Sequence, residues 1–297
     1  MLASAIREFA TSTKSALVAA AFFESTVQVW DLKSQTQTCE FPTLFSSGAR
    51  NLALAADGRM LVAGLSTVSG GVASYEVPSG NKLWERTLNF PSRLQFDPTG
   101  YSLLCTINRK SMLRIDASTG TTIELVDGIV RCIEGPYGDS LFVPLKEGGR
   151  PYSLIAAGRN FEISRLSFAL LSAEFSPQSV CLAEAAGPVR CISRDDGRLQ
   201  WICDPDKNSH VLLLHYSPRL DAFFGVLRHL NISGLSNLVR FDVTSGMMER
   251  VCDLDSWDVA FVDATDQLVT SSGEIRDLSD GALVGRLSFP LREYPDE

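Results

Sequence analysis

A short phrase that joins a polar residue to a glycine recurs along the chain and constrains its fold more than any other feature. The first copy is VWDLKSQT, from Val29, and the third is RIDASTGT, from Arg114. A polar residue stands third in each copy, and in five of the six copies a glycine follows four residues later. The polar residues are Asp31, Glu76, Asp116, Ser193, Asp242 and Asp277, and the glycines are Gly80, Gly120, Gly197, Gly246 and Gly281. Six copies predict a fold built from repeated units.

Each copy indicates a tight turn between two strands. A glycine adopts a positive φ at no steric cost, and an Asp or Ser side chain caps nearby backbone N–H groups. An alternating strand follows the turn, as in KLWERTL from Lys82. Two further apolar runs joined by a turn precede the phrase, as in RLQFDPTGYSLLCTI from Arg93. Each unit is therefore expected to contain four strands.

Seven first-strand segments can be counted, and the units begin about 35 to 50 residues apart. Four short strands in such a repeat are typical of a β-propeller blade. The predicted fold class is all-β, a seven-bladed β-propeller of four-stranded antiparallel blades that forms a single domain over residues 1–297. The expected blades span about 2–45, 46–89, 90–127, 128–168, 169–208, 209–254 and 255–290, with a short C-terminal tail at 291–297.

The blades resemble those of WD-repeat proteins, whose repeats combine an F-S-P-D-G turn with a later T-V-x-x-W-D strand. FSPQ from Phe175 and STVQVWDL from Ser25 are similar to these patterns. The resemblance covers nearly the whole chain, but only the first blade, with Trp30 and Asp31, matches the Trp-Asp signature closely. It implies that Trp30 packs between blades and that Asp31 braces the following turn. GNKLWERTL from Gly80 instead resembles turns of quinoprotein-type propellers.

Closure of the ring is expected to differ from that family. WD-repeat propellers usually close by pairing an N-terminal strand into the last blade, whereas here the first and last blades each supply four strands of their own. The seam between these two blades is then expected to be held by packing alone and to be the weakest interface in the ring.

Composition excludes several classes of protein. No run of 18 apolar residues is present, which argues against membrane insertion. A net charge of −8 argues against direct binding of nucleic acid, because neutralising phosphates requires a basic surface. The seven cysteines are scattered and include no Cys-x-x-Cys pair, which is typical of reduced thiols and predicts a cytoplasmic protein.

Catalytic and cofactor motifs are missing. The chain contains no phosphate-binding, dinucleotide, zinc-protease or esterase signature, so neither an enzymatic activity nor a cofactor is predicted. The three histidines, His210, His215 and His229, all fall in the sixth blade, but their spacing does not indicate convergence, and no metal site is predicted.

The excess negative charge is concentrated near the C-terminus. Between Asp253 and Asp280 the chain has eight acidic residues and a single basic residue, Arg276. They are expected either to occupy solvated turns or to form a patch that steers a basic partner onto the ring. The segment DLDSWD contains Asp253, Asp255, Trp257 and Asp258 and should lie in the loop that enters the seventh blade. Trp257 is either an interface anchor or a core residue of its strand.

Two long loops between second and third strands are expected to open on the same face. KEGGRPY supplies Lys146, Glu147 and Arg150, and HLNISGLSN supplies His229 and Asn231, as further candidate partner-binding residues. Polar, glycine-containing loops of this kind suit binding.

These features predict a non-enzymatic interaction module or scaffold that uses one face of the ring to bind a protein partner, which the acidic charge suggests is basic. One concrete version is an inhibitor or immunity protein for a basic toxin. The alternatives are a propeller enzyme of lactonase or hydrolase type, with its site at the central channel, and a structural subunit of a larger complex. The sequence leaves the oligomeric state open.

Overall fold

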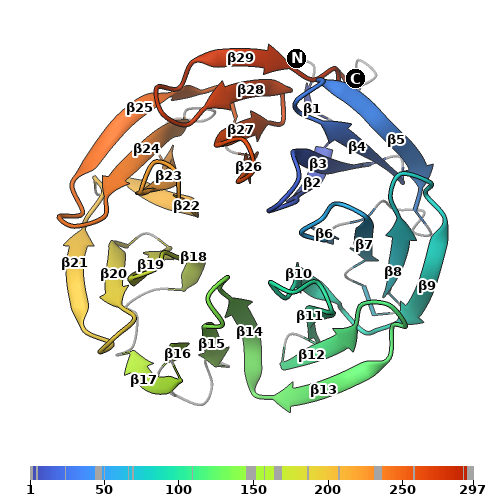
Figure 1. Ribbon diagram of the computed structural model, residues 1–297, viewed down its shortest axis with the longest axis horizontal. Helices are drawn as coiled ribbons and strands as arrows, with labels where there is room; N and C mark the ends of the chain where they lie inside the picture. The colour runs from blue at the N-terminus through green and yellow to red at the C-terminus, as the bar shows by residue number, and fades with distance from the viewer. Residues whose placement is uncertain are drawn as a thin grey trace.

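Seven four-stranded antiparallel sheets are arranged around a central axis in a computed structural model, so the predicted seven-bladed propeller is confirmed (Figure 1). The structure describes residues 3–4, 6–23, 25–43, 49, 51–65, 67–68, 70–108, 110–144, 152–156, 158–163, 169–185, 187–206, 208–230, 236–256, 258–289 and 291–292. Every blade is built from four consecutive strands, with the first nearest the axis and the fourth at the rim.

The strands of blades one to four are β2 (Ile6–Thr11), β3 (Leu17–Phe22), β4 (Thr26–Asp31) and β5 (Thr36–Pro42); β6 (Asn51–Leu54), β7 (Met60–Leu65), β8 (Gly71–Glu76) and β9 (Lys82–Thr87); β10 (Ser92–Phe96), β11 (Ser102–Ile107), β12 (Ser111–Asp116) and β13 (Thr122–Asp127); and β14 (Ile129–Glu134), β15 (Ser140–Pro144), β16 (Tyr152–Ala156) and β17 (Arg159–Ile163). Blades five to seven contain β18 (Leu170–Phe175), β19 (Ser179–Glu184), β20 (Val189–Ser193) and β21 (Leu199–Cys203); β22 (Ser209–Ser217), β23 (Ala222–His229), β24 (Ser236–Asp242) and β25 (Met248–Leu254); and β26 (Val259–Val262), β27 (Gln267–Thr270), β28 (Glu274–Asp277) and β29 (Leu283–Arg286).

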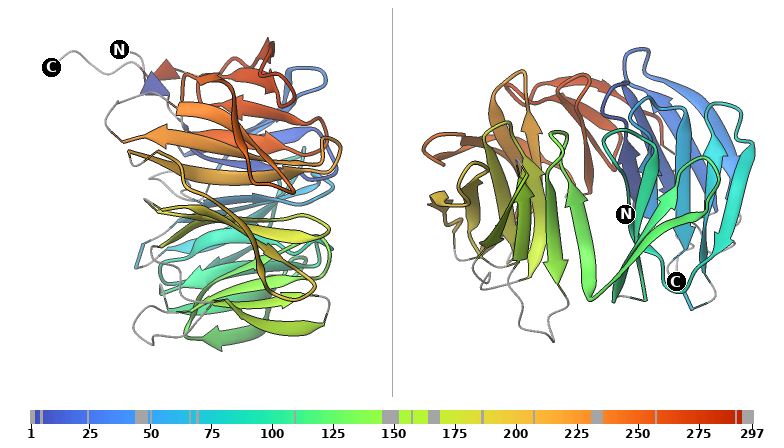
Figure 2. Two further views of the ribbon diagram at one scale, coloured as in Figure 1. Left: turned by 90° about the vertical axis from the view of Figure 1, so that its left-hand side faces the viewer. Right: turned by 60° about the horizontal axis from the view of Figure 1, so that its bottom comes forward.

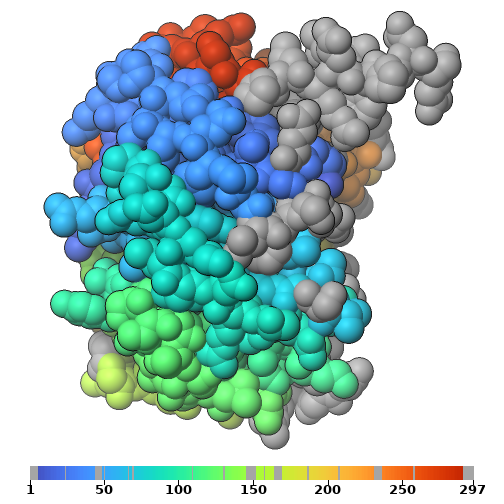
Figure 3. Space-filling view, turned by 90° about the vertical axis from the view of Figure 1, so that its right-hand side faces the viewer, coloured from blue at the N-terminus to red at the C-terminus, as the bar shows by residue number. Residues whose placement is uncertain are grey.

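The ring has two faces, and the strands run across its thickness between them (Figure 2). We call the face on which the first strands begin the entry face; residues 255, 256 and 258, between β25 and β26, lie there. The opposite exit face carries the turns between first and second strands and between third and fourth strands, such as residues 278–282. The fourth strands β5, β9 and β13 follow one another along the rim (Figure 3).

Apolar residues fill the spaces between blades. The second strands are buried along most of their length, as in β19, because a neighbouring blade covers each of their two faces. The fourth strands are mostly exposed, as in β13. The middle of each blade therefore needs a continuous apolar run, and the rim does not.

The repeated phrase forms the turn between third and fourth strands. In the third blade, Asp116 Oδ1 accepts hydrogen bonds from the backbone N–H groups of Ser118 and Thr119, at 3.0 and 2.8 Å. Both contacts recur at Asp242, and the first of them recurs at Asp31 and Asp277. Glu76 instead accepts a hydrogen bond from the hydroxyl of Ser79 at 2.5 Å. The five glycines of the phrase, Gly80, Gly120, Gly197, Gly246 and Gly281, have φ values of 70–74°.

The turn glycines also hold neighbouring blades together. Gly120 lies against the indole of Trp84 in the preceding blade, and a Cβ at Gly120 would stand 2.8 Å from that ring. Trp84 Nε1 donates a hydrogen bond to the carbonyl of Ala117 at 2.7 Å. Gly246 and Trp201 repeat this arrangement between blades five and six. A glycine is therefore required here by both its φ and the close packing of the next blade.

The closing seam between blades seven and one reverses this arrangement. Gln35, with φ 56°, stands at the glycine position of the first blade, and Gly285 stands third in β29, where Trp84 and Trp201 stand in β9 and β21. A Cβ at Gly285 would stand 2.4 Å from Gln35 Nε2. At this seam the large side chain lies in the turn and the glycine lies in the fourth strand, which is the reverse of the Trp84–Gly120 and Trp201–Gly246 contacts.

The expectation that packing alone holds this seam is wrong. Blade one does close without strand exchange, but β1 (Ala3–Ser4) pairs with β30 (Leu291–Arg292) as a separate two-stranded ribbon beside it. This pairing places the first described residues of the chain beside the last (Figure 1). Its second strand, β30, lies in the segment that was predicted to be a C-terminal tail. Inside the seam, Trp30 packs edge-on against Phe289, with ring centroids 5.8 Å apart.

The smallest apolar cluster among the described residues lies instead between blades three and four. Its buried members are Leu104, Met112 and Cys132 alone, whereas the closing seam buries twelve apolar residues. Glu124 occupies the third position of β13, where blades two, four and five carry Trp84, Phe161 and Trp201. This interface therefore lacks the contact of an aromatic ring with a turn glycine that those three residues make. Polar contacts replace it: Arg114 pairs with Glu134 and, at 3.5 Å, with Glu124.

Candidate functional site

The eight acids near the C-terminus are divided between the two faces of the ring, because successive strands of a blade run in opposite directions. Four lie at the entry face and four at the exit face. The entry-face acids are Asp253, Asp255, Asp258 and Glu274, and the exit-face acids are Asp263, Asp266, Asp277 and Asp280.

Three of the exit-face acids have local structural roles. Asp277 Oδ1 accepts the backbone N–H of Ser279 at 2.8 Å, and Asp280 Oδ1 accepts that of Ala282 at 2.9 Å. Asp266 is buried and pairs with Arg219. These side chains brace turns and are already engaged within the ring.

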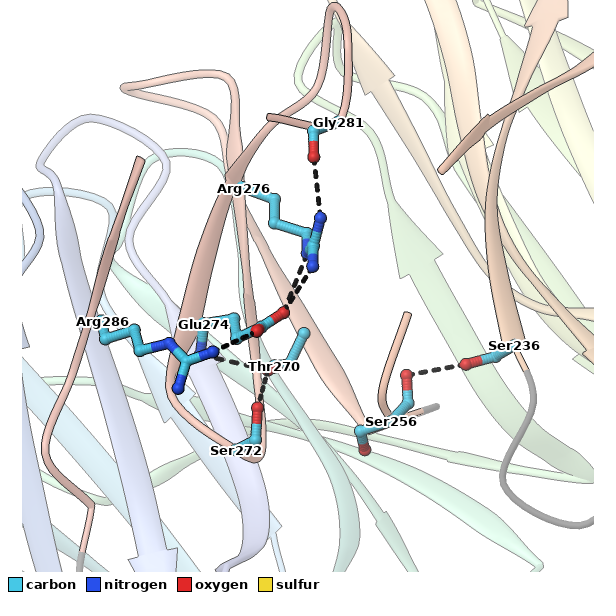
Figure 4. Close-up of polar contacts among 8 residues, drawn as sticks. All are labelled: Ser236, Ser256, Thr270, Ser272, Glu274, Arg276, Gly281 and Arg286. Carbon is cyan, nitrogen blue, oxygen red and sulfur yellow. Dashed lines mark hydrogen bonds and ion pairs between the residues drawn. The ribbon is translucent and has the colours of Figure 1, made fainter. Parts of the chain in front are cut away.

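Glu274 is held inside the seventh blade by two arginines (Figure 4). Its carboxylate accepts hydrogen bonds from Arg276 Nη2 and Arg286 Nη2, both at 2.7 Å. Arg276 also donates to the carbonyl of Gly281 at 2.9 Å, which links the carboxylate to the turn at the exit face. Glu274 is only 7% exposed, so it belongs to the scaffold of the blade.

Asp253 and His229 are joined by a polar network that crosses all four strands of the sixth blade. His229 Nε2 lies 2.7 Å from Asn237 Oδ1, and Asn237 Nδ2 donates to Asp253 Oδ1 at 2.5 Å. Because an amide oxygen only accepts, Nε2 carries the proton and Nδ1 accepts from the hydroxyl of Ser209 at 2.8 Å. Both ring nitrogens of His229 are therefore engaged within the blade.

Asp255 and Asp258 are the exposed acids of the loop that enters the seventh blade. Asp258 borders a cleft of about 320 Å³ at the entry mouth of the channel. Lining residues of this cleft come from β2 and β22 as well as the start of β26, and they include Glu8 and Arg7. Burial and then the charge of Asp258 raise the pKa of Glu8 to about 7.

The opposite side of the entry mouth is basic. Arg131 on β14 donates to the carbonyl of Leu171 at 3.0 Å. Burial and then the charge of Arg93, on β10, lower the pKa of Arg131 to about 9. The entry mouth thus has an acidic side at blades seven and one and a basic side at blades three and four.

The remaining candidate partner-binding residues lie outside the described part of the chain. They are Lys146, Glu147, Arg150, Asn231 and Trp257.

A cavity of about 610 Å³, lined by residues that were not among the predicted site residues, occupies the exit half of the central channel. First strands of all seven blades line it. The channel cavity contains Glu174 on β18, His215 on β22 and Asp263 after β26. Glu174 and His215 occupy the same place in EFSP and HYSP, one residue before the aromatic residue of the turn. Comparing these two copies could have predicted adjacent titratable residues on the channel wall.

Burial shifts the pKa values of these three groups away from their usual ranges. Burial and the charge of Asp263 raise the pKa of Glu174 to about 8, and burial raises that of Asp263 to about 6. Burial lowers the pKa of His215 to about 4, and its ring stacks on Phe261 with centroids 4.9 Å apart. At neutral pH the cavity therefore holds a protonated Glu174, a charged Asp263 and a neutral His215.

The raised pKa of Glu174 predicts a pH-dependent gain in stability for Glu174→Gln. From pH 4.5 to about 8 the folded carboxyl keeps a proton that the unfolded chain has released, so this group lowers stability as pH rises. The variant is expected to be more stable than wild type by on the order of 3 kcal/mol at pH 8 and equal to it below pH 4.5. Urea unfolding at both pH values measures this difference, and an equal effect at the two would contradict it.

No group of three His, Cys, Asp or Glu side chains within the described ranges could hold a metal ion. In the part of the chain that the structure describes, no helix is long and apolar enough to cross a bilayer. All seven cysteines are free thiols.

Comparison with known proteins places the chain by its fold. No protein-family model matches the sequence, and no curated protein matches it. A chain in the crystal structure of the mitotic checkpoint complex is 14% identical, with a TM-score of 0.70 over 94% of this chain and 90% of that chain. The WD40 repeats of RRP9 are 13% identical, with a TM-score of 0.69 over 97% and 95%. U3-55K is 14% identical, with a TM-score of 0.65 over 89% and 87%. The predicted likeness to WD-repeat propellers is confirmed, and at these identities it concerns the fold.

Proposed function

We propose that this propeller is a non-enzymatic protein-interaction module that binds a basic protein partner at the entry face. The observation that carries the proposal is the entry cleft, which is lined by the exposed Asp258 and the partly buried Glu8. Asp255 and Asp253 are the next acids toward the rim, and Asp253 pairs with Arg250. We call Glu8, Asp253, Asp255 and Asp258 the entry acids.

A basic side chain in the entry cleft removes an electrostatic cost that the free protein carries. Burial and then the charge of Asp258 disfavour ionisation of Glu8. A lysine or arginine between the two carboxylates would stabilise both charges, and the apolar side chains of Ile6, Phe9 and Leu212 provide contact area for its aliphatic part. The basic residues Arg93 and Arg131, across the mouth, restrict the orientation in which such a partner can approach.

Reversal of charge in the entry loop is expected to abolish partner capture. We expect the double variant Asp255→Lys/Asp258→Lys to retain less than about a tenth of the partner that wild type retains from a native lysate, because like charges across an interface cost several kcal/mol. The measurement is a pull-down quantified by mass spectrometry.

The matched control is Asp195→Lys/Glu249→Lys, which makes the same change in charge at two exposed residues near the exit face. It should capture the partner as wild type does. Equal capture by wild type and the entry-loop variant would exclude the entry acids as the binding surface, and equal loss in both double variants would indicate a nonspecific effect of net charge.

One version of the proposal is an acidic inhibitor or immunity protein for a basic toxin, and it requires the captured partner to lose activity on binding. A structural subunit would instead be captured with several partners at fixed stoichiometry. The free state of all seven thiols supports a cytoplasmic location.

A hydrolase is the second candidate, and one observation favours it. Glu174 and Asp263 have pKa values of about 8 and 6, and a pair of carboxyl groups with separated pKa values suits acid–base catalysis. Hydrolysis of a lactone panel by wild type, lost in Glu174→Gln, would support an enzyme over an interaction module.

A further inference from the structure

The channel cavity contains two acids that lack the partners found at the other acids of its wall. Its titratable and charged lining residues are Lys14, Asp97, Glu134, Glu174, His215 and Asp263. Asp97 accepts hydrogen bonds from the hydroxyls of Thr99 and Ser102, both at 2.9 Å, and Glu134 pairs with Arg114. Among the described residues, no side chain donates a hydrogen bond to Glu174, which accepts one from the backbone N–H of Phe175. Asp263 accepts one from its own backbone N–H, and the side-chain donor nearest to it is His215 Nδ1, at 3.5 Å.

His215 provides an independent sign that a donor is missing. The residue is 5% exposed, and its Nε2 is buried without a hydrogen-bond partner in the described part of the chain. With the proton on Nδ1, which faces Asp263, Nε2 is an acceptor with no donor. A buried polar atom left unsatisfied costs about 1–3 kcal/mol, so a ligand that supplied an N–H group would recover this cost.

We propose that the channel cavity is a binding site for an alkylammonium group, held by Glu174 and Asp263 with His215 beside them. An ammonium group offers three N–H donors and a positive charge, which match two carboxylates and an unpaired imidazole nitrogen. The same wall carries apolar side chains, among them Phe9, Leu94 and Leu213, for an aliphatic chain. The volume of about 610 Å³ is within the usual range for small-molecule sites.

A metal ion fits this arrangement less well than an organic cation. Within the described residues, Glu174, His215 and Asp263 do not form a group that could hold one ion in common. An alkylammonium ligand does not need all its acceptors within one small coordination sphere, because its donors point in different directions.

Binding of an ammonium group should release a proton from Glu174. Besides His215 and Asp263, the titratable groups near this carboxyl are Cys181, which pairs with it across β18 and β19, and Tyr137, whose pKa burial and Glu174 raise. Below pH 8 the empty site holds a protonated Glu174, whereas the occupied site favours its charged form. Affinity should therefore rise by up to about tenfold from pH 6 to pH 7.

The ammonium group could belong to a free amine or to a lysine side chain of a partner, and calorimetry with defined probes distinguishes them. The probes are cadaverine, N-acetyl-lysine amide, 1-pentanol as the uncharged chain, and Ca²⁺. We expect one saturable site for at least one amine and binding of pentanol at least about tenfold weaker, because the carboxylates contribute only to a charged ligand. Preference for cadaverine indicates a free amine, and preference for the lysine derivative indicates a partner side chain.

Variants connect the binding to these residues. Glu174→Gln and, separately, Asp263→Asn should each weaken amine binding at least about tenfold at pH 7.5, since each removes a charged acceptor. Glu249→Gln changes the same charge at an exposed rim residue and should bind as wild type. Absence of saturable amine binding, equal binding by Glu174→Gln and wild type, or binding of Ca²⁺ in place of the amines would overturn the proposal. The entry acids lie on the opposite face, so its failure leaves the proposed partner surface untouched.

Discussion

Replacement of Trp201 by alanine is expected to lower the free energy of unfolding by about 4 kcal/mol. The side chain is 7% exposed, stacks on Phe241 with ring centroids 6.2 Å apart, and covers Gly246 of the next blade. Its Nε1 donates to the carbonyl of Val243 at 2.8 Å. Alanine would leave a cavity between blades five and six, and the fixed turn could not move inward to fill it. Urea unfolding followed by circular dichroism measures the loss.

Leu199→Ala is the matched control because Leu199 lies on the same strand and is 50% exposed. We expect it to cost less than about 1 kcal/mol, as for most surface substitutions. Comparable losses in the two variants would mean that the ring-on-glycine contact contributes nothing beyond ordinary burial.

Replacement of Glu274 by alanine is expected to destabilise the protein by about 3 kcal/mol, because it leaves a partly buried guanidinium without its counter-charge. The side chain of Arg276 is 21% exposed and that of Arg286 66%, so most of the cost should come from Arg276. Thermal unfolding at low and at 1 M salt measures it, and the loss should be little changed by salt because a buried pair is weakly screened.

The double variant Glu274→Ala/Arg276→Ala provides the control. Removing both charges should recover part of the lost stability, because no unpaired cation remains inside the blade. A double variant that is clearly less stable than Glu274→Ala would contradict this explanation. The stability loss in Glu274→Ala would then not come from the unpaired charge of Arg276.

The repeated architecture could be predicted from sequence because each blade is specified locally. The turn at Asp116 and Gly120 depends on residues within five positions of each other, so its signal survives in almost every copy. The exchange of large and small residues at Gln35 and Gly285 could not be predicted in this way. These two positions are 250 residues apart and become neighbours only when the ring closes.

The candidate sites were harder to predict for the same reason. Charge counting grouped eight acids by sequence position, whereas the antiparallel strands separate them onto two faces. Glu174, His215 and Asp263 come from three different blades, and none of them belongs to a recognisable motif. Asp253, Asp255 and Asp258 could be assigned to a common surface from sequence, because they lie close together in the chain just before the seventh blade.

The rate of association with the captured partner, measured at 50 mM and 500 mM salt, tests the proposed entry-face interaction most directly. Electrostatic steering by the entry acids predicts a wild-type association rate that falls at least about tenfold over this range. It also predicts that Asp255→Lys/Asp258→Lys slows association at low salt, while Asp195→Lys/Glu249→Lys does not. A wild-type rate that is independent of salt and unchanged by reversal of the entry loop would contradict the account.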